Sequence, residues 1–448
     1  MTVKNHRSPL RLLTRVTLGL YEFFWHLLLP VVLLRLYWKG RTQRGYRQNI
    51  LERLGCYKKR VSSNKLVWVH AVSVGETRAS APLVQALLSD GYQVLLTHMT
   101  PTGRQTGSEI FSKAIAAGQL QQTYLPYDVS WAVGAFLRKF KPTLGLVMET
   151  EIWPVLLRTA VKAHVPLLLV NARLSERSAR KTLKFGSIAK DIYQSFNQIL
   201  AQTSIDAKRY ESLGLNRVTV TGNLKFDVAP NFSQIDEAVN LRKNLSAEMQ
   251  IVCAASTRDG EEEIVIAAWA SLMKAHPDLA KTARLIIVPR HPQRFDEVHQ
   301  LLQSNASLVA RKSQLADELS FADALNKNAI ILGDSMGEMS FYYALSDLVV
   351  MGGSLLPLGG QNFIEACSLG CPAILGEHTF NFQQASQDVI DAHAAIRVAN
   401  VDELSKAMAL LLSDKQLREK MSANAIDFSG QHMGATGKIM DEIGRAHV

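Results

Sequence analysis

Short apolar runs alternate with amphipathic segments along most of this chain, and this alternation limits the folds that it can adopt. In the first half the apolar runs lie at residues 66–71, 92–97, 144–148, 167–171, 198–201 and 218–221, and in the second half at 250–254, 283–288, 329–332, 348–351 and 372–375. Helical segments such as 81–88 and 133–138 separate them. Runs of this kind are typical of a doubly wound parallel sheet, so we predict an α/β fold.

A polar segment at residues 225–245 interrupts the alternation and predicts a linker. We therefore expect an N-terminal domain over 61–228, a linker over 229–248 and a C-terminal domain over 249–441. Two Rossmann-like domains are expected to face a cleft at the carboxyl ends of their sheets, where open α/β sheets bind ligands. Such a cleft suits an enzyme that joins two substrates.

The net charge of +10 comes from the first 60 residues. Residues 1–60 hold 13 Lys/Arg and 2 Asp/Glu, whereas the remainder holds 37 Lys/Arg and 38 Asp/Glu. This separation disfavours a nucleic-acid partner, which requires a basic face on a folded domain. It favours attraction of the N-terminal segment to an anionic membrane surface.

The same N-terminal segment contains a long apolar stretch at residues 16–38. Basic residues flank it, namely Arg7, Arg11 and Arg15 before it and Lys39, Arg41, Arg44 and Arg47 after it. The longest uncharged run, 23–34, is short for a spanning helix. We predict a membrane anchor over 1–60 that either spans a membrane or lies in its interface, with a buried core helix as the less favoured alternative. The basic residues that follow the anchor would hold the body of the protein on the cytoplasmic side.

Two further features of composition bear on chemistry. The four cysteines are scattered, which disfavours a disulfide scaffold and suits a reducing compartment. No acidic cluster with metal-ligand spacing is evident, so we expect no metal ion and no cofactor. The last seven residues, 442–448, resemble a translated sequencing-adaptor tail that is not native to the protein, and we expect no function for them.

The first predicted strand ends in Ser73-Val74-Gly75-Glu76, and a helical segment at 77–88 follows at once. We expect Gly75 to allow a tight turn, which leaves Glu76 at the carboxyl end of a strand as a candidate general base. The alternative is an acid at a helix start that interacts with the helix dipole. The dipole lowers the pKa of such an acid, and we expect a desolvated cleft to oppose that effect.

Other loops of the first half also carry charged residues at strand ends. Glu149 and Glu151 follow the strand at 144–148, and we expect one to face the cleft and the other to cap a helix. Lys225 lies beside the predicted linker, where it either faces developing phosphate charge or is a solvated surface residue.

In the second half, three strand ends are expected to converge on one ligand. A glycine-rich stretch, 352–360, precedes Asn362 and Glu365, which predict a nucleotide site with the carboxylate on the ribose hydroxyls or, alternatively, a capping-box pair. Arg290 follows the strand at 283–288 and offers a forked donor for phosphate. The segment 333–339 contains glycines that permit close approach of the backbone to a base or sugar.

Taken in order, these motifs closely resemble those of the 3-deoxy-D-manno-octulosonic acid (Kdo) transferase family of lipopolysaccharide synthesis. They lie at residues 70–76, 148–154, 171–175, 222–227, 288–295, 333–339, 352–366 and 378–382. The resemblance implies a GT-B glycosyltransferase with an inverting mechanism and an N-terminal inner-membrane anchor. It implies the transfer of Kdo from CMP-Kdo to the lipid A precursor lipid IVA.

The resemblance also implies roles for individual residues. Glu76 matches the catalytic base of the family, and Glu149 and Lys225 match positions assigned to transition-state stabilisation. The positions that match the CMP-binding loops are Pro289, Arg290, Met336, Gly337, Glu338, Asn362, Phe363, Ile364 and Glu365.

Three other functions are weighed against this one. The nearest alternative is another lipid-linked GT-B glycosyltransferase that uses a UDP-sugar. A sugar-nucleotide epimerase shares the architecture but needs no lipid acceptor, so the predicted anchor disfavours it. A membrane-surface scaffold or nucleic-acid binder is disfavoured because the basic charge is confined to residues 1–60.

Overall fold

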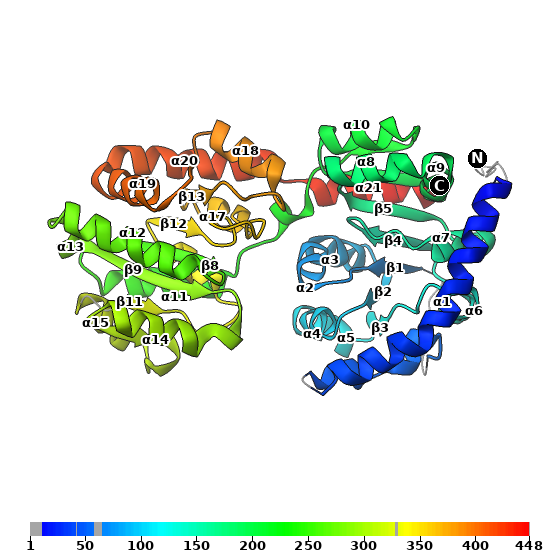
Figure 1. Cartoon of the computed structure of the whole chain (residues 1–448), viewed down its shortest axis with the longest axis horizontal. Coiled ribbons are helices and arrows are strands. Elements are labelled where there is room, and N and C mark those ends of the chain that lie inside the picture. Colours follow the sequence, from blue (N-terminus) through cyan, green and yellow to red (C-terminus); the bar gives the residue numbers. More distant parts are fainter. Residues whose placement is uncertain (1–10, 42, 58–64, 328–329, 448) are drawn as a thin grey trace. The chain divides into compact units, whose positions relative to one another are not determined.

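The chain forms two compact units, which Figure 1 shows in the colours of the sequence. The structure is a computed structural model that describes residues 11–41, 43–57, 65–327 and 330–447. Unit 1 comprises Met1–Val228 and Met433–Val448, and unit 2 comprises Ala229–His432. Residues 1–10 (with Arg7), 42 and 58–60 of the predicted anchor and its basic flank, and residue 448 of the predicted tail, lie outside the described residues.

Unit 1 is built on a seven-stranded sheet in the order β3-β2-β1-β4-β5-β6-β7, with every neighbouring pair parallel. Its strands are β1 (Leu66–His70), β2 (Gln93–His98), β3 (Leu120–Tyr124), β4 (Leu144–Met148), β5 (Leu167–Ala172), β6 (Gln198–Ala201) and β7 (Val218–Val220). Strand β1 lies in the interior of the sheet and is buried along its whole length. An apolar run on both faces of a strand is the pattern expected of such a position.

Unit 2 repeats this architecture with the order β10-β11-β9-β8-β12-β13-β14, again entirely parallel. Its strands are β8 (Gln250–Thr257), β9 (Ala283–Pro289), β10 (Val309–Arg311), β11 (Ile330–Leu332), β12 (Leu348–Met351), β13 (Ala373–Gly376) and β14 (Ala395–Val398). The predicted α/β class with two parallel-sheet domains is therefore confirmed.

Three edge strands were not predicted from the sequence, namely β3, β10 and β14. Each carries polar residues where a central strand would be apolar, such as Gln121 and Gln122 in β3, Arg311 in β10 and Arg397 in β14. An edge strand is partly solvated, so it lacks the continuous apolar run that identifies a buried parallel strand.

Helices flank both sheets. Those of unit 1 are α1 (Leu12–Lys39), α2 (Val74–Ala79), α3 (Ala81–Ser89), α4 (Pro101–Ile110), α5 (Ser112–Ala116), α6 (Ser130–Phe140), α7 (Pro154–Lys162), α8 (Glu176–Lys184), α9 (Gly186–Tyr193), α10 (Ser204–Ser212) and α21 (Ala435–His447). Short 3₁₀ turns are η1 (Arg44–Arg47), η2 (Ile50–Leu54) and η3 (Leu224–Asp227).

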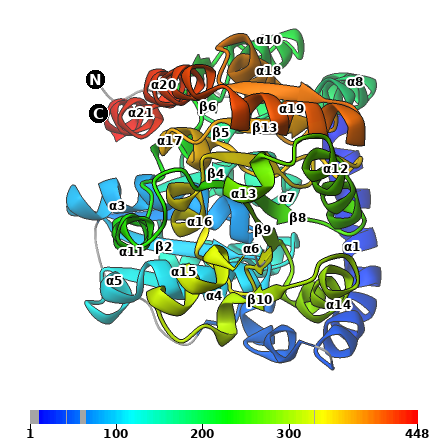
Figure 2. The same cartoon turned by 90° about the vertical axis from the view of Figure 1, so that its left-hand side faces the viewer.

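The helices of unit 2 are α11 (Phe232–Lys243), α12 (Glu261–Ala275), α13 (Leu279–Thr282), α14 (Phe295–Asn305), α15 (Glu318–Asn326), α16 (Met339–Leu345), α17 (Ile364–Ser368), α18 (Gln383–Asp391), α19 (Val401–Ser413) and α20 (Lys415–His432), with 3₁₀ turns η4 (Pro292–Arg294) and η5 (Lys312–Gln314). Figure 2 shows α11, α15 and α16 on one face of this sheet and α12 and α14 on the other.

Two segments lie elsewhere than the sequence-based division suggests. Helix α11 occupies most of the segment 229–248 and contacts α16 within unit 2. Helix α21 packs on unit 1, where Ile439 and Ile443 are buried in the same core cluster as Leu83. Residues 433–441 therefore contact unit 1, and the segment 442–448 begins within a packed helix.

Helix α1 is the one helix among the described residues that is long and apolar enough to cross a membrane. It covers 28 residues, a longer segment than the apolar stretch at 16–38. Length and composition alone are weak evidence of a span, and the contacts of α1 with unit 1 are described below.

Candidate active site

Glu76 lies in the first turn of α2, directly after β1. Its Oε2 accepts a hydrogen bond from the backbone N–H of Val72 at 2.8 Å, and its Oε1 accepts one from the Ser73 hydroxyl at 3.1 Å. Ser73 is the N-cap of α2, and its hydroxyl oxygen accepts from the Glu76 N–H at 3.4 Å. The two alternatives for Glu76, a helix-start acid and a strand-end acid, thus describe the same position.

The expected role of Gly75 in a tight turn is wrong. Gly75 lies inside α2, outside the left-handed region, and a Cβ atom there would meet the Ser73 hydroxyl only at 3.9 Å, an ordinary contact. The chain leaves β1 through residues 71–73 and enters the helix at the Ser73 cap. The single predicted helix at 77–88 is also divided, because α2 ends at Ala79 and α3 begins at Ala81.

The environment of Glu76 raises its pKa to about 7. Burial is the largest cause, and the negative charges of Glu149 and Glu151 act in the same direction. The hydrogen bonds from Val72 and Ser73 favour the ionised form but do not outweigh the burial. A carboxylate with a pKa near 7 can take up a proton at neutral pH, which is the property required of a general base.

Glu149 follows β4, the strand that pairs with β1 in the sheet. Its backbone has φ of 53°, in the left-handed region, which costs about 1–3 kcal/mol for a residue other than glycine. Its Oε1 lies 3.5 Å from the Nζ of Lys225, which belongs to the 3₁₀ turn η3 after β7. The fold therefore brings Glu149 and Lys225 into contact although they follow different strands of the sheet.

Glu151 does not cap the following helix. Its Oε2 accepts a hydrogen bond from the Trp153 indole at 3.0 Å, and burial, aided by the charge of Glu149, raises its pKa. The cap of α7 is Asp128, which accepts from the backbone N–H groups of residues 155 and 156 at 3.0 and 2.7 Å. The expectation that one acid of this pair caps a helix is therefore wrong.

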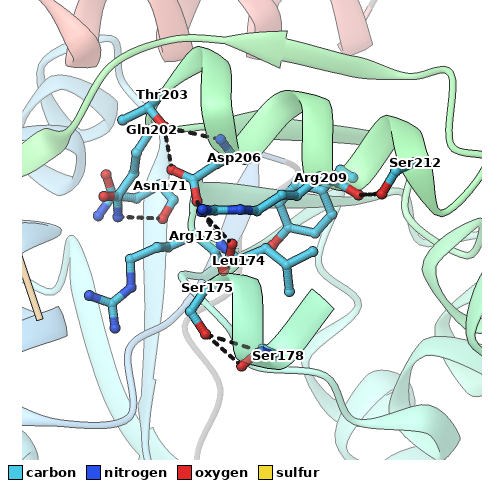
Figure 3. Close-up of polar contacts among 11 residues, drawn as sticks. Asn171, Arg173, Leu174, Ser175, Ser178, Gln202, Thr203, Asp206, Arg209 and Ser212 are labelled. Carbon is cyan, nitrogen blue, oxygen red and sulfur yellow. Dashed lines mark hydrogen bonds and ion pairs between the residues drawn. The ribbon is translucent and has the colours of Figure 1, made fainter. Parts of the chain in front are cut away.

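Asn171 connects the end of β5 to the turn that carries Lys225. Its side chain is fully buried, its φ is 52°, and its Oδ1 accepts from the backbone N–H of Leu224 at 3.0 Å. Its carbonyl oxygen accepts from the side-chain amide of Gln202 at 2.9 Å, a contact drawn in Figure 3. Asn171 therefore fixes the backbone of η3 one residue before Lys225.

The loop that follows Asn171 is held by helix α10 (Figure 3). The Asp206 carboxylate accepts from the Leu174 N–H at 2.9 Å and from the Thr203 hydroxyl at 2.6 Å, and the Arg209 guanidinium donates to the Leu174 carbonyl at 3.0 Å. Figure 3 shows the Arg173 side chain directed away from these contacts. The loop is thus anchored by its backbone.

In unit 2, a buried carboxylate organises the glycine-rich loop after β12. Glu261, at the start of α12, is fully buried and accepts from the backbone N–H groups of Gly353 at 2.6 Å and Leu355 at 2.9 Å. A Cβ atom at Gly352 would lie 2.3 Å from the Ser256 carbonyl oxygen, so only glycine fits there. The sequence analysis did not identify Glu261, because its partners lie 92 and 94 residues away.

Arg290 and the segment 333–339 lie at the carboxyl ends of β9 and β11, as predicted. The backbone N–H of Arg290 donates to the Thr257 carbonyl oxygen at 2.8 Å. Glu338 accepts from the Lys312 ammonium at 2.7 Å and from the Ser335 hydroxyl, and Gly337 has φ of 83°. Pro289 closes β9 and Met336 is half exposed.

The last predicted group surrounds the start of α17. Asn362 Oδ1 accepts from the Ile364 N–H at 3.2 Å, and Glu365 Oε1 accepts from the Ser340 hydroxyl at 2.6 Å. The side chains of Phe363 and Ile364 are each 1% exposed. Phe363 and Ile364 are therefore part of the packed interior of unit 2, whereas Glu365 is half-buried and bonded to a buried serine.

Among the residues that the structure describes, no group of three or more His, Cys, Asp or Glu side chains could hold a metal ion. The described cysteines are free thiols, and Cys253, Cys367 and Cys371 are buried.

Two family models match the chain, one in each unit. Residues 48–228 match the model described as 3-deoxy-D-manno-octulosonic-acid transferase (kdotransferase). Residues 264–428 match the model described as glycosyl transferases group 1.

Curated relatives agree with this assignment, and solved structures share the fold. The chain is 43% identical over 377 residues to a 3-deoxy-D-manno-octulosonic acid transferase of Bordetella pertussis, covering 84% of this chain and 86% of the relative. It is 34% identical to that of Haemophilus influenzae, covering 88% and 91%. A UDP-GlcNAc 2-epimerase from Neisseria meningitidis superposes with a TM-score of 0.55 at 14% identity, covering 85% of this chain and 100% of that structure. The last match concerns the fold alone, and the predicted GT-B class is confirmed.

Proposed function

Because the chain belongs to the 3-deoxy-D-manno-octulosonic acid (Kdo) transferase family, we propose that it transfers Kdo from CMP-Kdo to a hydroxyl group of lipid IVA, with Glu76 as the general base. The chain is a glycosyltransferase, and the proposal concerns its donor, its acceptor and the roles of its residues. The observation that carries the proposal is the half-satisfied carboxylate of Glu76, with its pKa raised to about 7 at the end of β1.

Glu76 accepts the proton of the attacking hydroxyl group. As the proton moves to the carboxylate, the acceptor oxygen forms a bond to the anomeric carbon of Kdo, and the bond from that carbon to the CMP phosphate oxygen breaks. An alcohol is a weak nucleophile at neutral pH, so a positioned base of matched pKa contributes about 10²–10⁴-fold to the rate. Attack on the face opposite to the leaving group inverts the configuration.

The leaving CMP carries away negative charge, which Lys225 is proposed to stabilise. The ion pair at 3.5 Å with Glu149 and the Asn171 bond to the preceding backbone N–H support this role, because both restrict where Lys225 can lie. A preorganised cation costs no reorganisation as the charge develops. Glu149 is thus proposed to act through Lys225.

The CMP moiety is proposed to bind unit 2 at Pro289, Arg290, Met336, Gly337, Glu338, Asn362, Phe363, Ile364 and Glu365. Arg290 offers a forked donor to the phosphate. Glu365 is proposed to accept from the ribose hydroxyl groups.

Lipid IVA is a membrane lipid, so the proposal places the enzyme at the cytoplasmic side of the inner membrane. The apolar helix α1 supports this location. No nucleic-acid partner is proposed.

The test is a transfer assay with purified full-length protein, CMP-Kdo and lipid IVA, followed by mass spectrometry of the lipid product. We expect the mass of lipid IVA to rise by one or more Kdo units, and we expect CMP to compete with the donor more strongly than UDP does. Transfer from a UDP-sugar, or stronger competition by UDP, would favour the alternative lipid-linked glycosyltransferase. No lipid product with either donor would contradict the proposal.

A further inference from the structure

One face of helix α1 is docked along unit 1 over nearly its whole length. Thr14, Leu18 and Leu36 are buried. Tyr21, Glu22, Trp25, Leu29 and Val32 are half-buried. These positions recur at intervals of three and four residues, so they form a single stripe along the helix. Figure 1 shows α1 running beside unit 1, where it contacts α7 and α9.

The centre of the stripe is an ionised carboxylate. Glu22 Oε1 accepts from the backbone N–H of Ser130 at 2.7 Å, and Glu22 Oε2 accepts from the Arg158 guanidinium at 2.8 Å. Ser130 begins α6, whose own N-cap residue, Val129, provides no side-chain cap. Burial acts to raise the pKa of Glu22, but the bonds from Ser130 and Arg158 outweigh it and lower the pKa. Glu22 therefore caps α6 as a charged group.

Contacts on both sides of Glu22 extend the docking. The Thr14 hydroxyl donates to Asp191 on α9 at 2.6 Å, in a buried contact. The Trp25 ring stacks on Tyr127 with ring centroids 5.7 Å apart. Removing α1 from unit 1 would leave the Arg158 guanidinium and the Asp191 carboxylate without these partners.

The opposite face of α1 is apolar and exposed. Its exposed large side chains are Leu12, Leu13, Val16, Leu20, Phe23, Phe24, Leu27, Leu28, Val31, Leu34, Tyr37 and Trp38. At the carboxyl end, the Arg47 guanidinium lies 4.0 Å from the centre of the Tyr37 ring, and Lys39 and Arg41 are exposed nearby in the sequence. Aromatic and basic residues together are typical of the interface between a membrane and water.

The length of the docked stripe decides between the two kinds of anchor. From Thr14 to Leu36 the helix rises about 33 Å, so the docked stripe is as long as a bilayer core of about 30 Å is thick. Within the described residues 11–41, no segment long enough to span is left outside the docked stripe. A spanning α1 would carry the charged groups of unit 1 at its docked face into hydrocarbon, where such groups are costly.

We propose that α1 lies in the plane of one leaflet of an anionic phospholipid bilayer, with its apolar face in the lipid and its docked face on unit 1. Both ends of the helix are then on the same side of the membrane. The inference rests on the membrane location proposed above, but not on the identity of the transferred sugar.

Topology labelling tests the orientation. In a Cys56→Ser background, whose remaining cysteines are buried, one cysteine added at a time by Arg11→Cys or Arg41→Cys marks an end of α1. An impermeant maleimide is applied to intact spheroplasts and to inverted inner-membrane vesicles. We expect both cysteines to react in inverted vesicles and neither to react in spheroplasts. Reaction of Arg11→Cys in spheroplasts together with reaction of Arg41→Cys in inverted vesicles would overturn the proposal.

Vesicle flotation tests the lipid-facing surface. The Phe23→Asp/Phe24→Asp variant should bind phosphatidylglycerol-containing vesicles at least about tenfold more weakly, because two exposed aromatic side chains that would enter the lipid are replaced by charged ones. Leu319→Asp, which changes another exposed apolar residue in unit 2, is the matched control and should bind normally. Failure of the unaltered protein to float, or equal binding of both variants, would contradict the inference, whereas the transfer assay reports separately on the proposed function.

A charge swap tests the docking. Glu22→Arg should lower the thermal midpoint of unit 1, and addition of Arg158→Glu should restore part of it. An unchanged midpoint in both variants would show that α1 is not docked and would overturn the proposal.

Discussion

The two units use glutamates in opposite ways, one fully buried and one half-buried. Glu261 in unit 2 accepts hydrogen bonds from the backbone N–H groups of Arg258, Gly353, Leu355 and Leu356 at 2.9, 2.6, 2.9 and 3.4 Å. Glu76 in unit 1 accepts from one backbone N–H and one hydroxyl group, and burial raises its pKa to about 7. Glu261 uses its hydrogen bonds to hold a loop in place. Glu76 makes few hydrogen bonds, and its raised pKa lets it take up a proton near neutral pH.

In the proposed function, proton transfer belongs to unit 1 and nucleotide binding to unit 2. The variant with the largest expected effect is Glu76→Gln, which preserves the shape of the side chain and the Val72 contact but removes the base. We expect the turnover rate to fall about 10²–10⁴-fold, with CMP affinity unchanged in calorimetry. Near-normal turnover by a folded variant would remove Glu76 from the mechanism.

The matching change in unit 2 is Glu261→Ala. Several hydrogen bonds to a charged acceptor are lost at about 1.5–3 kcal/mol each, so we expect the free energy of unfolding of unit 2 to fall by at least about 3 kcal/mol. Thermal or urea unfolding measures this. Glu263→Ala, an exposed acid in the same helical turn, is the control and should change little. Equal stability of the two variants would contradict the structural role of Glu261.

Lys225→Met tests whether unit 1 also stabilises the leaving group. We expect kcat to fall about 10²-fold, the effect of losing one preorganised electrostatic contact, with little change in KM for the donor. Lys243→Met, at the end of α11 in unit 2, provides a matched control. A rise in KM with kcat unchanged would instead assign Lys225 to ground-state binding.

Glu365→Ala gives the smallest expected effect on function. Loss of the carboxylate from the proposed ribose contact should weaken CMP binding about tenfold, as expected for a hydrogen bond to a charged group, and should slow the turnover of bound substrate less. Titration calorimetry with CMP measures the affinity. An unchanged affinity would count against a ribose contact.

Much of this arrangement follows from local sequence, but its long-range contacts do not. The strand before Glu76 was predicted because it is apolar on both faces, and its carboxyl end is where the α/β fold places ligands. The turn itself was predicted wrongly, since a glycine before a helix is also compatible with the helix, and here Ser73 supplies the cap.

The residues that support the site could not be predicted from local sequence patterns. Asn171 holds the backbone of Leu224, 53 residues further on, and Glu261 holds a loop more than 90 residues away. Such contacts depend on the order of strands in the sheet. Glu22 did leave a signal, because an acid within an apolar stretch requires a partner, but the sequence did not identify Ser130 and Arg158 as that partner.

The most direct test of the central claim is the pH dependence of kcat/KM, which reports the pKa of the essential base in the free enzyme. The pKa of Glu76 is raised from 4.5 to about 7, so the base is protonated below that pH and activity should fall as the pH drops through about 7. We predict an acid limb with an apparent pKa near 7 that is absent from the residual activity of Glu76→Gln. A limb near 4.5, or the same limb in both proteins, would contradict the assignment of Glu76 as the base.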